Sequence, residues 1–235
     1  MNTAPKMEKY LHKARVAALQ GSIRKPYFQD LGRHLAVETY AGSGGSTECV
    51  SRGFAVGKDI SYKVARTKID ASEQDGIYHT TLMAQVEGLR IGERITVDKV
   101  TCRLHSIFDS REYPNRCLPR ILPAGSTIKN LRIDGKIQKL DLPRAFEENE
   151  RTHVPFFLGK RDDDSALQPG PIPDPIYVPG LGTIFYAEWT WVHRDERHQQ
   201  RLTMLRFALG SDFGAGIDTA YGSSDGTGWP PTQSL

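Results

Sequence analysis

The sequence lacks the cysteine pattern of a metal knuckle or a redox pair. Its three cysteines, Cys49, Cys102 and Cys117, are odd in number and widely spaced, and no two form a C-x-x-C pair. This excludes a zinc-knuckle or thioredoxin-like function. No stretch approaches the roughly 18 consecutive apolar residues that a membrane-spanning helix requires. No secretion signal is visible, because basic residues interrupt the first apolar stretch, and we therefore expect a cytoplasmic protein.

Motifs of several catalytic and nucleotide-binding classes are also missing. The sequence contains neither a phosphate-binding P-loop nor an H-E-x-x-H metal motif. The glycine cluster at residues 42–45 is not followed by a helical pattern, so it is no dinucleotide fingerprint. The acidic run at residues 162–164 lacks the alternating ligand spacing of a calcium loop. We therefore expect no cofactor and no metal site.

The charge is small overall but unevenly placed. The net charge is +3, and residues 1–33 contain seven basic residues against two acidic ones. That segment therefore carries +5 and the remaining chain −2. A basic arm can contact nucleic acid or anionic lipid, or it can be an ordinary solvated surface. We favour the solvated surface and keep nucleic-acid or membrane binding as the last of our alternatives.

Residues 4–20 show apolar residues at helical intervals. Met7, Leu11, Ala14 and Ala18 recur three or four positions apart, and Gly21 follows as a helix stop. We predict a short N-terminal helix here, which together with a basic arm makes up residues 1–33. Such a helix would dock on the remaining chain, which is the alternative that we favour, pair with a second subunit in a homo-oligomer, or lie on a membrane.

From residue 34 onward the alternation typical of β-strands replaces the helical period. The clearest strands are residues 77–86 and 94–108, which we predict to form an antiparallel hairpin with His79 near Cys102. A turn at Asp134-Gly135 marks another hairpin.

This pattern predicts a mainly β fold. We expect an antiparallel two-sheet sandwich, with a closed β-barrel as the alternative. The β domain spans residues 34–222 and contains an irregular, proline-rich loop at residues 143–180. The last hairpin, with strands at 183–193 and 201–209, is apolar on both faces and should lie centrally. Residues 223–235 form a predicted flexible tail.

Glu188 is the most conspicuous carboxylate, because it lies inside the otherwise apolar segment 184–191. Burial of an unpaired carboxylate raises its pKa, which is one way to make a general acid or base. The alternative, which we favour, is an ion pair with a strand arginine such as Arg206, or exposure at a sheet edge.

Histidines and tryptophans of the strands are the other candidates for a site. Strands that pack together can bring histidines into an acid/base pair or a metal site. The histidine candidates are His79, His105 and His193. Trp189 and Trp191 share a predicted face with Phe185, where they could stack on a flat ligand or belong to the core.

Five short motifs carry a resemblance to a known group of proteins. They are Val86–Gly92, Ile95–Val100, Gly125–Gly135, Val178–Ile184 and Arg201–Leu205. Their succession over residues 77–222 resembles a family of uncharacterised bacterial β-rich proteins and, more distantly, the choice-of-anchor surface proteins. The resemblance implies a β fold and a bacterial origin, and it adds no catalytic residue. The surface proteins carry an export signal and an anchor that are not visible here, so an extracellular location is only an alternative.

These observations favour a non-catalytic binding or assembly module, whose ligand is an unknown protein or small molecule. The first alternative is an enzyme with a pocket inside the β fold, which would use Glu188 and the strand histidines. The second is nucleic-acid or anionic-membrane binding through the basic N-terminal segment.

Overall fold

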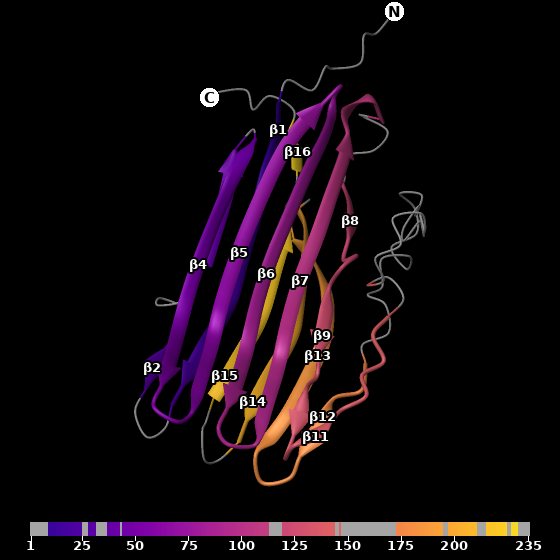
Figure 1. The fold of residues 1–235 in the computed structure, drawn as a ribbon. Helices are drawn as coiled ribbons and strands as arrows, with labels where there is room; N and C mark the ends of the chain where they lie inside the picture. The colour runs from indigo at the N-terminus through magenta and orange to yellow at the C-terminus, as the bar shows by residue number, and fades with distance from the viewer. Residues whose placement is uncertain are drawn as a thin grey trace, which may run out of the picture.

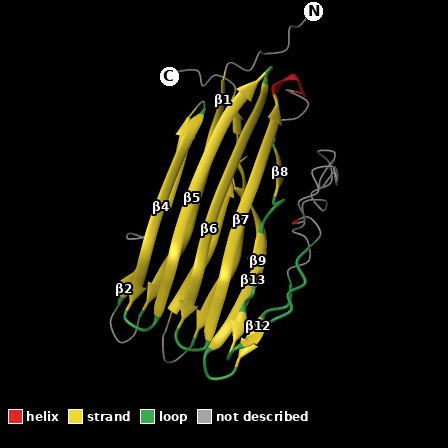
Figure 2. Cartoon of the chain, viewed as in Figure 1, coloured by secondary structure: helices red, strands yellow, loops and turns green. Residues whose placement is uncertain are grey.

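The computed structural model shows antiparallel strands arranged in two sheets (Figure 1). It describes residues 9–24, 28–31, 37–42, 44–112, 119–143, 146, 173–194, 197–210, 215–224 and 227–229. No α-helix occurs among these residues, and η1 (Ser110–Glu112) is a 3-10 helix (Figure 2). The prediction of a mainly β fold with two antiparallel sheets is therefore confirmed.

Sheet 1 is built from strands near the two ends of the chain. The order across it is β12, β13, β14, β15 and β1, and β16 pairs with β1 beyond the end of β15. The strands β2 and β3 pair with the other side of β1. The bounds are β1 (Lys9–Ile23), β2 (Gln29–Asp30), β3 (Val37–Gly42), β12 (Ile176–Val178), β13 (Gly182–Arg194), β14 (Arg197–Leu209), β15 (Ala215–Ser224) and β16 (Thr227–Trp229).

Sheet 2 is an antiparallel meander of long strands. The order is β4, β5, β6 and β7, and the far side of β7 pairs with β8, β9 and β10 in turn. The short strand β11 pairs with β10. The bounds are β4 (Gly45–Val56), β5 (Ile60–Gln74), β6 (Ile77–Ile91), β7 (Ile95–Asp109), β8 (Arg120–Leu122), β9 (Thr127–Lys129), β10 (Arg132–Ile133) and β11 (Lys136–Ile137).

The N-terminal helix predicted for residues 4–20 is wrong in its described part, because residues 9–20 belong to strand β1. The strand lies between β15 on one side and β2 and β3 on the other, and residues 16–19 are completely buried. A strand that is buried on both faces carries a continuous apolar run. Apolar residues of such a run also fall at helical intervals, which explains the wrong prediction. In the folded chain, pairing with neighbouring strands outweighs the helical preference of the alanines.

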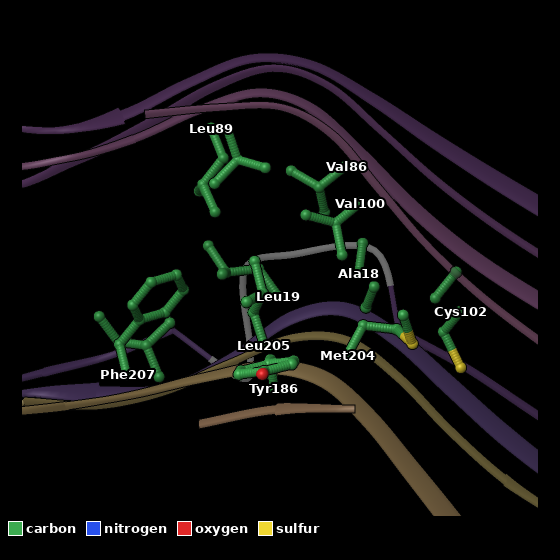
Figure 3. Close-up of a cluster of buried hydrophobic side chains, with 14 of the residues drawn as sticks. Ala18, Leu19, Val86, Leu89, Val100, Cys102, Tyr186, Met204, Leu205 and Phe207 are labelled. Carbon is green, nitrogen blue, oxygen red and sulfur yellow. The ribbon is translucent and has the colours of Figure 1, made fainter. Parts of the chain in front are cut away.

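The closed barrel that we kept as an alternative is also wrong, since the described strands form two separate sheets. Their inner faces pack together, with Leu89 of sheet 2 facing Leu205 of sheet 1 across the core (Figure 3). Gly222 marks a close approach of the two sheets. A Cβ atom added there would lie 2.6 Å from Leu82 Cδ1 and 3.0 Å from Cys102 Sγ.

Strands β6 and β7 form the predicted hairpin, but in a different register. His79 pairs with Ile107, five positions beyond Cys102, and Cys102 pairs with Ala84. The expected proximity of His79 to Cys102 is therefore wrong. Strand β6 continues to Ile91 instead of ending at residue 86, which moves the turn along the chain. The alternation of apolar and polar residues predicts which face of the strand a residue occupies. The position of the turn sets the register.

Sheet 2 bends along one row of residues that crosses its long strands. At this row the strands switch between burying even-numbered and burying odd-numbered residues. Gly53 of β4 and Gly88 of β6 have φ angles of 65° and 64°. The flanking pairs place them in one row with Lys63 of β5 and Asp98 of β7. Strand β6 buries even-numbered residues before this row and odd-numbered residues after it. Two consecutive residues therefore face outward, as on the convex side of a bend.

Sheet 1 bends in the same direction at an equivalent row. Ala187 of β13 and Ala220 of β15 have φ angles of 51° and 52°, and they lie in one row with Met204 and Ala18. Here the two consecutive residues face the core, because the convex side of sheet 1 is its inner face. Figure 3 shows the ribbons of both sheets curving together. Each alanine accepts a left-handed conformation that costs about 1–2 kcal/mol.

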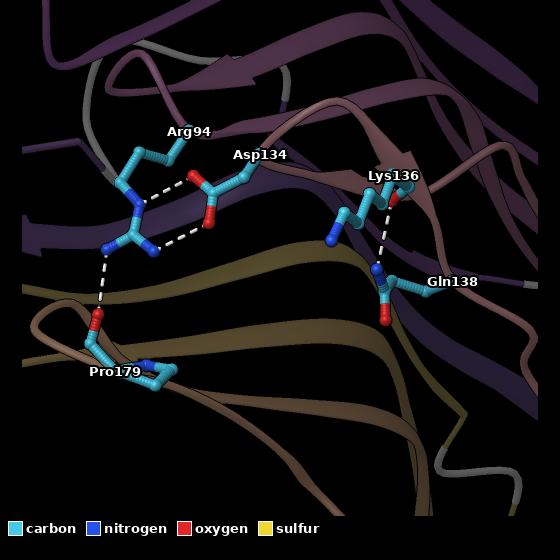
Figure 4. Close-up of polar contacts among 5 residues, drawn as sticks. All are labelled: Arg94, Asp134, Lys136, Gln138 and Pro179. Atoms are coloured by element: carbon cyan, nitrogen blue, oxygen red, sulfur yellow. Dashed lines mark hydrogen bonds and ion pairs between the residues drawn. The ribbon is translucent and has the colours of Figure 1, made fainter.

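Arg94 joins the two sheets at one end of the sandwich (Figure 4). Its guanidinium donates two hydrogen bonds of 2.7 Å to the Asp134 carboxylate, in the β10–β11 turn of sheet 2. It donates a third, of 2.8 Å, to the carbonyl oxygen of Pro179 in the β12–β13 turn of sheet 1. Hydrogen bonding within the pair raises the pKa of Arg94 and lowers that of Asp134. The turn predicted at Asp134-Gly135 is confirmed.

Candidate ligand-binding site

A hollow of about 610 Å³ lies on the outer face of sheet 2. Outward-facing residues of β6 and β7 form its floor, β9 and the loop before it form one side, and Leu142, Pro143 and Phe146 form the other. The Ser126 hydroxyl fixes the first side against β7: it accepts a hydrogen bond of 2.8 Å from the Arg103 N–H and donates one of 3.0 Å to the Arg103 carbonyl oxygen.

Three cationic side chains line this hollow: Lys99 and Arg103 of β7 and Lys129 of β9. Lys99 and Lys129 are directly opposed across the two strands, and like charges in that position destabilise a sheet. The Glu87 carboxylate lies 3.5 Å from Lys99 Nζ. In the described part of the chain, the side chains of Arg103 and Lys129 make no ion pair. The hollow therefore holds an excess of positive charge.

The Thr101 hydroxyl lies between these cations without a hydrogen-bond partner among the described residues. Thr101 lines the hollow and is only 8% exposed. A buried hydroxyl that makes no hydrogen bond costs about 1–3 kcal/mol. An anionic group bound in the hollow would offset the repulsion between the two opposed lysines.

The opposite side of the hollow is apolar. It consists of Leu142, Pro143 and Phe146, and Phe146 is only 4% exposed. The N–H of Gly125 donates a hydrogen bond of 3.1 Å to the Phe146 carbonyl oxygen. This bond ties the apolar side to the loop before β9. The hollow thus presents cations on one side and an apolar surface on the other.

The structure places Glu188 beside Arg206 on the outer face of sheet 1. The guanidinium of Arg206 donates two hydrogen bonds of 2.6 Å to the two carboxylate oxygens of Glu188, and it lies 4.0 Å from the ring centroid of Phe185. Hydrogen bonding to Glu188 raises the pKa of Arg206. The ion pair that we favoured over a general acid or base is present.

Asp218 extends this cluster, because it pairs across the strands with Arg206 and with Gln20. The Gln20 side chain donates a hydrogen bond of 3.2 Å to its carboxylate. Burial raises the pKa of Asp218 above its ordinary value, while Gln20 and Arg206 oppose that shift.

Two of the three candidate histidines come together. His79 Nδ1 and His105 Nε2 are 3.3 Å apart, and their rings stack with centroids 5.5 Å apart. Both rings lie on the outer face of sheet 2. Glu188 lies on the outer face of sheet 1, so the two sheets and the core separate it from these histidines. The side chain of His193 lies outside the described residues.

Trp189 faces the core. It is 6% exposed, and its indole N–H donates a hydrogen bond of 3.1 Å to the side-chain oxygen of Gln200. The positive φ at Ala187 shifts the alternation of β13, so Phe185 faces outward while Trp189 faces inward. The shared face predicted for them is therefore wrong. The side chain of Trp191 is not among those that the structure describes.

One serine motif escaped our sequence reasoning. Residues 222–226 match the G-x-S-x-G pattern of a nucleophile elbow, centred on Ser224. That elbow places an exposed serine between a strand and a helix. Here Ser224 ends β15, pairs with Ala14 and Gln200, and is 1% exposed, and strand β16 follows. The match therefore lacks the structural context of a nucleophile.

The residues of the hollow were also missed from the sequence. The alternation of Lys99, Thr101 and Arg103 along one face of β7 was a visible signal, since all three point away from the core. The contribution of Lys129 and Phe146 had no sequence signal, because it depends on the pairing of β9 with β7 and on the contact of Phe146 with the loop before β9.

The remaining predictions concern the cysteines and the basic segment. Cys102 is completely buried, and burial strongly raises the pKa of its thiol. Of the N-terminal basic residues, Arg15 and Arg24 are exposed. The described residues contain no group of three or more His, Cys, Asp or Glu side chains placed to hold a metal ion. A helix long and apolar enough to cross a membrane is likewise absent from them.

Comparison with known proteins gives one match. Residues 10–163 match a family model described as a domain of unknown function, DUF8256. No curated protein and no solved structure matches the chain.

Proposed function

We propose that this chain, which belongs to the DUF8256 family, is a non-catalytic binding module for a small anionic ligand with an apolar portion. The ligand would occupy the hollow on the outer face of sheet 2. The observation that carries the proposal is the surplus of cations around Thr101. Lys99 and Lys129 oppose each other across the strands, and Arg103 makes no ion pair in the described part of the chain.

The chemistry of the hollow selects the ligand class. Lysine and arginine side chains donate to carboxylate, phosphate or sulfate oxygens, and charge-assisted hydrogen bonds of this kind are the stronger ones. The apolar surface of Leu142, Pro143 and Phe146 favours a ligand whose anionic group is attached to a ring or an alkyl chain.

The enzyme alternative has less support. Its acid or base, Glu188, is held by Arg206 through two hydrogen bonds, and the paired histidines lie on the opposite outer face. A binding role needs only the surplus of positive charge and the apolar side, and the hollow combines both.

Isothermal titration calorimetry would test the proposal, with inorganic phosphate, phenyl phosphate and phenol as probes. We expect phenyl phosphate to bind more tightly than phosphate, and phenol not to bind. The Arg103→Ala and Lys129→Ala substitutions should each weaken phenyl phosphate binding at least tenfold. The matched control is Lys58→Ala, which removes an exposed lysine from the β4–β5 turn and should leave the affinity unchanged.

Two results would overturn the proposal. One is the absence of binding by either phosphate compound at low salt, where charge attraction is least screened. The other is an equal loss of affinity in Lys58→Ala and Lys129→Ala, which would indicate general attraction of anions to a basic protein.

A further inference from the structure

Strand β4 is the long free edge of sheet 2 (Figure 1). It has 12 residues, and among the described strands only β5 pairs with it. Two other edge strands are much shorter. β11, at the opposite edge of sheet 2, has 2 residues, and β12, at one edge of sheet 1, has 3. A long edge strand exposes a row of backbone donors and acceptors that can pair with another strand. Edge protection by proline or lysine is absent from residues 45–52.

The exposed side chains of β4 are arranged symmetrically about Val50. Glu48, Val50 and Arg52 are all exposed, whereas Cys49 and Ser51 between them are half-buried. The exposed fraction of Val50 is 43%, which is high for a large apolar side chain. Two residues before it stands a negative charge and two residues after it a positive one. An antiparallel partner of the same sequence, centred on Val50, would place each charge opposite its complement.

We infer that β4 is a self-association edge, through which two copies of this chain join in an antiparallel pair about Val50. In that register Val50 faces Val50 of the second copy, and Glu48 of each copy faces Arg52 of the other. Directly opposed residues lie on the same face of an antiparallel sheet, so these pairs form contacts. Sheet 2 of one copy would continue into sheet 2 of the second.

The single chain leaves this charge pattern incomplete. Glu48 pairs across the strands with Lys68, whose ammonium already binds the Asp70 carboxylate at 2.8 Å. Arg52 pairs with Val64 and makes no ion pair within the described part of the chain. A second copy would supply a carboxylate for each Arg52. This inference rests on β4 alone and is independent of the anionic ligand proposed above.

The first test exchanges the charges of Glu48 and Arg52. Dimer formation is measured by sedimentation velocity of the full chain over a range of concentrations. We expect the wild type to form dimers as concentration rises. Glu48→Arg and Arg52→Glu should each weaken the dimer at least tenfold, because like charges then face each other twice. The double variant should recover an affinity within about threefold of the wild type. Arg90→Glu, an exposed reversal on β6, is the matched control and should not weaken it.

Cross-linking fixes the register in a second test. In a chain with Cys49→Ser and Cys117→Ser, the Val50→Cys variant should form a disulfide-linked dimer on oxidation. Opposed Cα atoms are about 4.5–5.5 Å apart in antiparallel pairs, within the range that a disulfide spans. The control is Ala55→Cys in the same background, because residue 55 would face Gly45 and should not cross-link.

A wild type that stays monomeric at all concentrations would overturn the inference, as would a double variant no better than the single ones. Efficient cross-linking at position 55 but not at position 50 would contradict the register. A dimer that resists all charge reversals would show that another surface is responsible.

Discussion

The outer faces of the two sheets differ in whether their cationic side chains have carboxylate partners. On sheet 1, Arg206 is held by the Glu188 carboxylate, lies over the Phe185 ring and pairs across the strands with Asp218. On sheet 2, two lysines oppose each other, and Arg103 has no ion pair within the described residues. In the first cluster the chain itself supplies a carboxylate for the cation. In the second cluster the cationic hydrogen-bond donors outnumber the acceptors.

This difference separates a structural cluster from a candidate site. A conspicuous carboxylate in an apolar strand draws attention in the sequence, yet the chain itself neutralises Glu188. The residues around Thr101 are less conspicuous, because each is an ordinary polar residue on the outward face of a strand. Only the alternation of Lys99, Thr101 and Arg103 is visible in the sequence. A ligand is needed where the chain leaves charges and donors without partners, and the comparison can be tested on both faces.

The largest expected effect is on sheet 1. Glu188→Gln removes the charge that holds Arg206, and hydrogen bonds to charged groups contribute about 1.5–3 kcal/mol. Because the Arg206 side chain is 40% exposed, solvent screening reduces this contribution. We expect the free energy of unfolding to fall by about 1–2 kcal/mol in urea denaturation. Binding of phenyl phosphate should not change, and a loss of binding would link the two faces that we have separated.

On sheet 2 we expect a substitution to stabilise the protein. Thr101→Val replaces an unpaired, buried hydroxyl by a methyl group of similar size, so the free energy of unfolding should rise by about 1 kcal/mol. The same variant should bind phenyl phosphate as tightly as the wild type, because the hydroxyl oxygen is not exposed to the hollow. Urea denaturation without ligand and calorimetry with ligand give the two values. A destabilised variant would mean that the hydroxyl has a partner in the folded chain.

The smallest effect concerns the pH dependence of sheet 1. Burial raises the pKa of Asp218 in the folded state, so the folded chain holds this proton more tightly than the unfolded chain. The resulting stability is present below the unfolded pKa of about 3.9 and is lost as the pH rises through the folded value. Asp218→Asn should remove that loss.

Denaturation of the wild type and of Asp218→Asn between pH 3.5 and 6.5 would measure this difference, because the other titrating groups are common to both chains. The stability of the variant relative to the wild type should increase with pH over this window. A constant difference would contradict the raised pKa.

Particular elements show how far the sequence could lead. The hairpin of β6 and β7 and the turn at Asp134-Gly135 were predictable, because alternation and turn residues are local signals. The ion pair of Glu188 with Arg206 was the favoured alternative, since a carboxylate in an apolar strand requires a partner. Strand β1 was not predictable, because burial on both faces removes the alternation that would identify a strand.

The sequence by itself determined that this chain is mainly β and which residues of β6 before Gly88 and of β7 after Asp98 face the core, because side chains alternate along an extended backbone. The tertiary structure decided the register, the place of β1 in sheet 1, and the reversal of faces at Ala187. It also brought Lys129 opposite Lys99. Pairing and bending depend on contacts between distant segments, and the surplus of charge that defines the candidate site exists only once those segments meet.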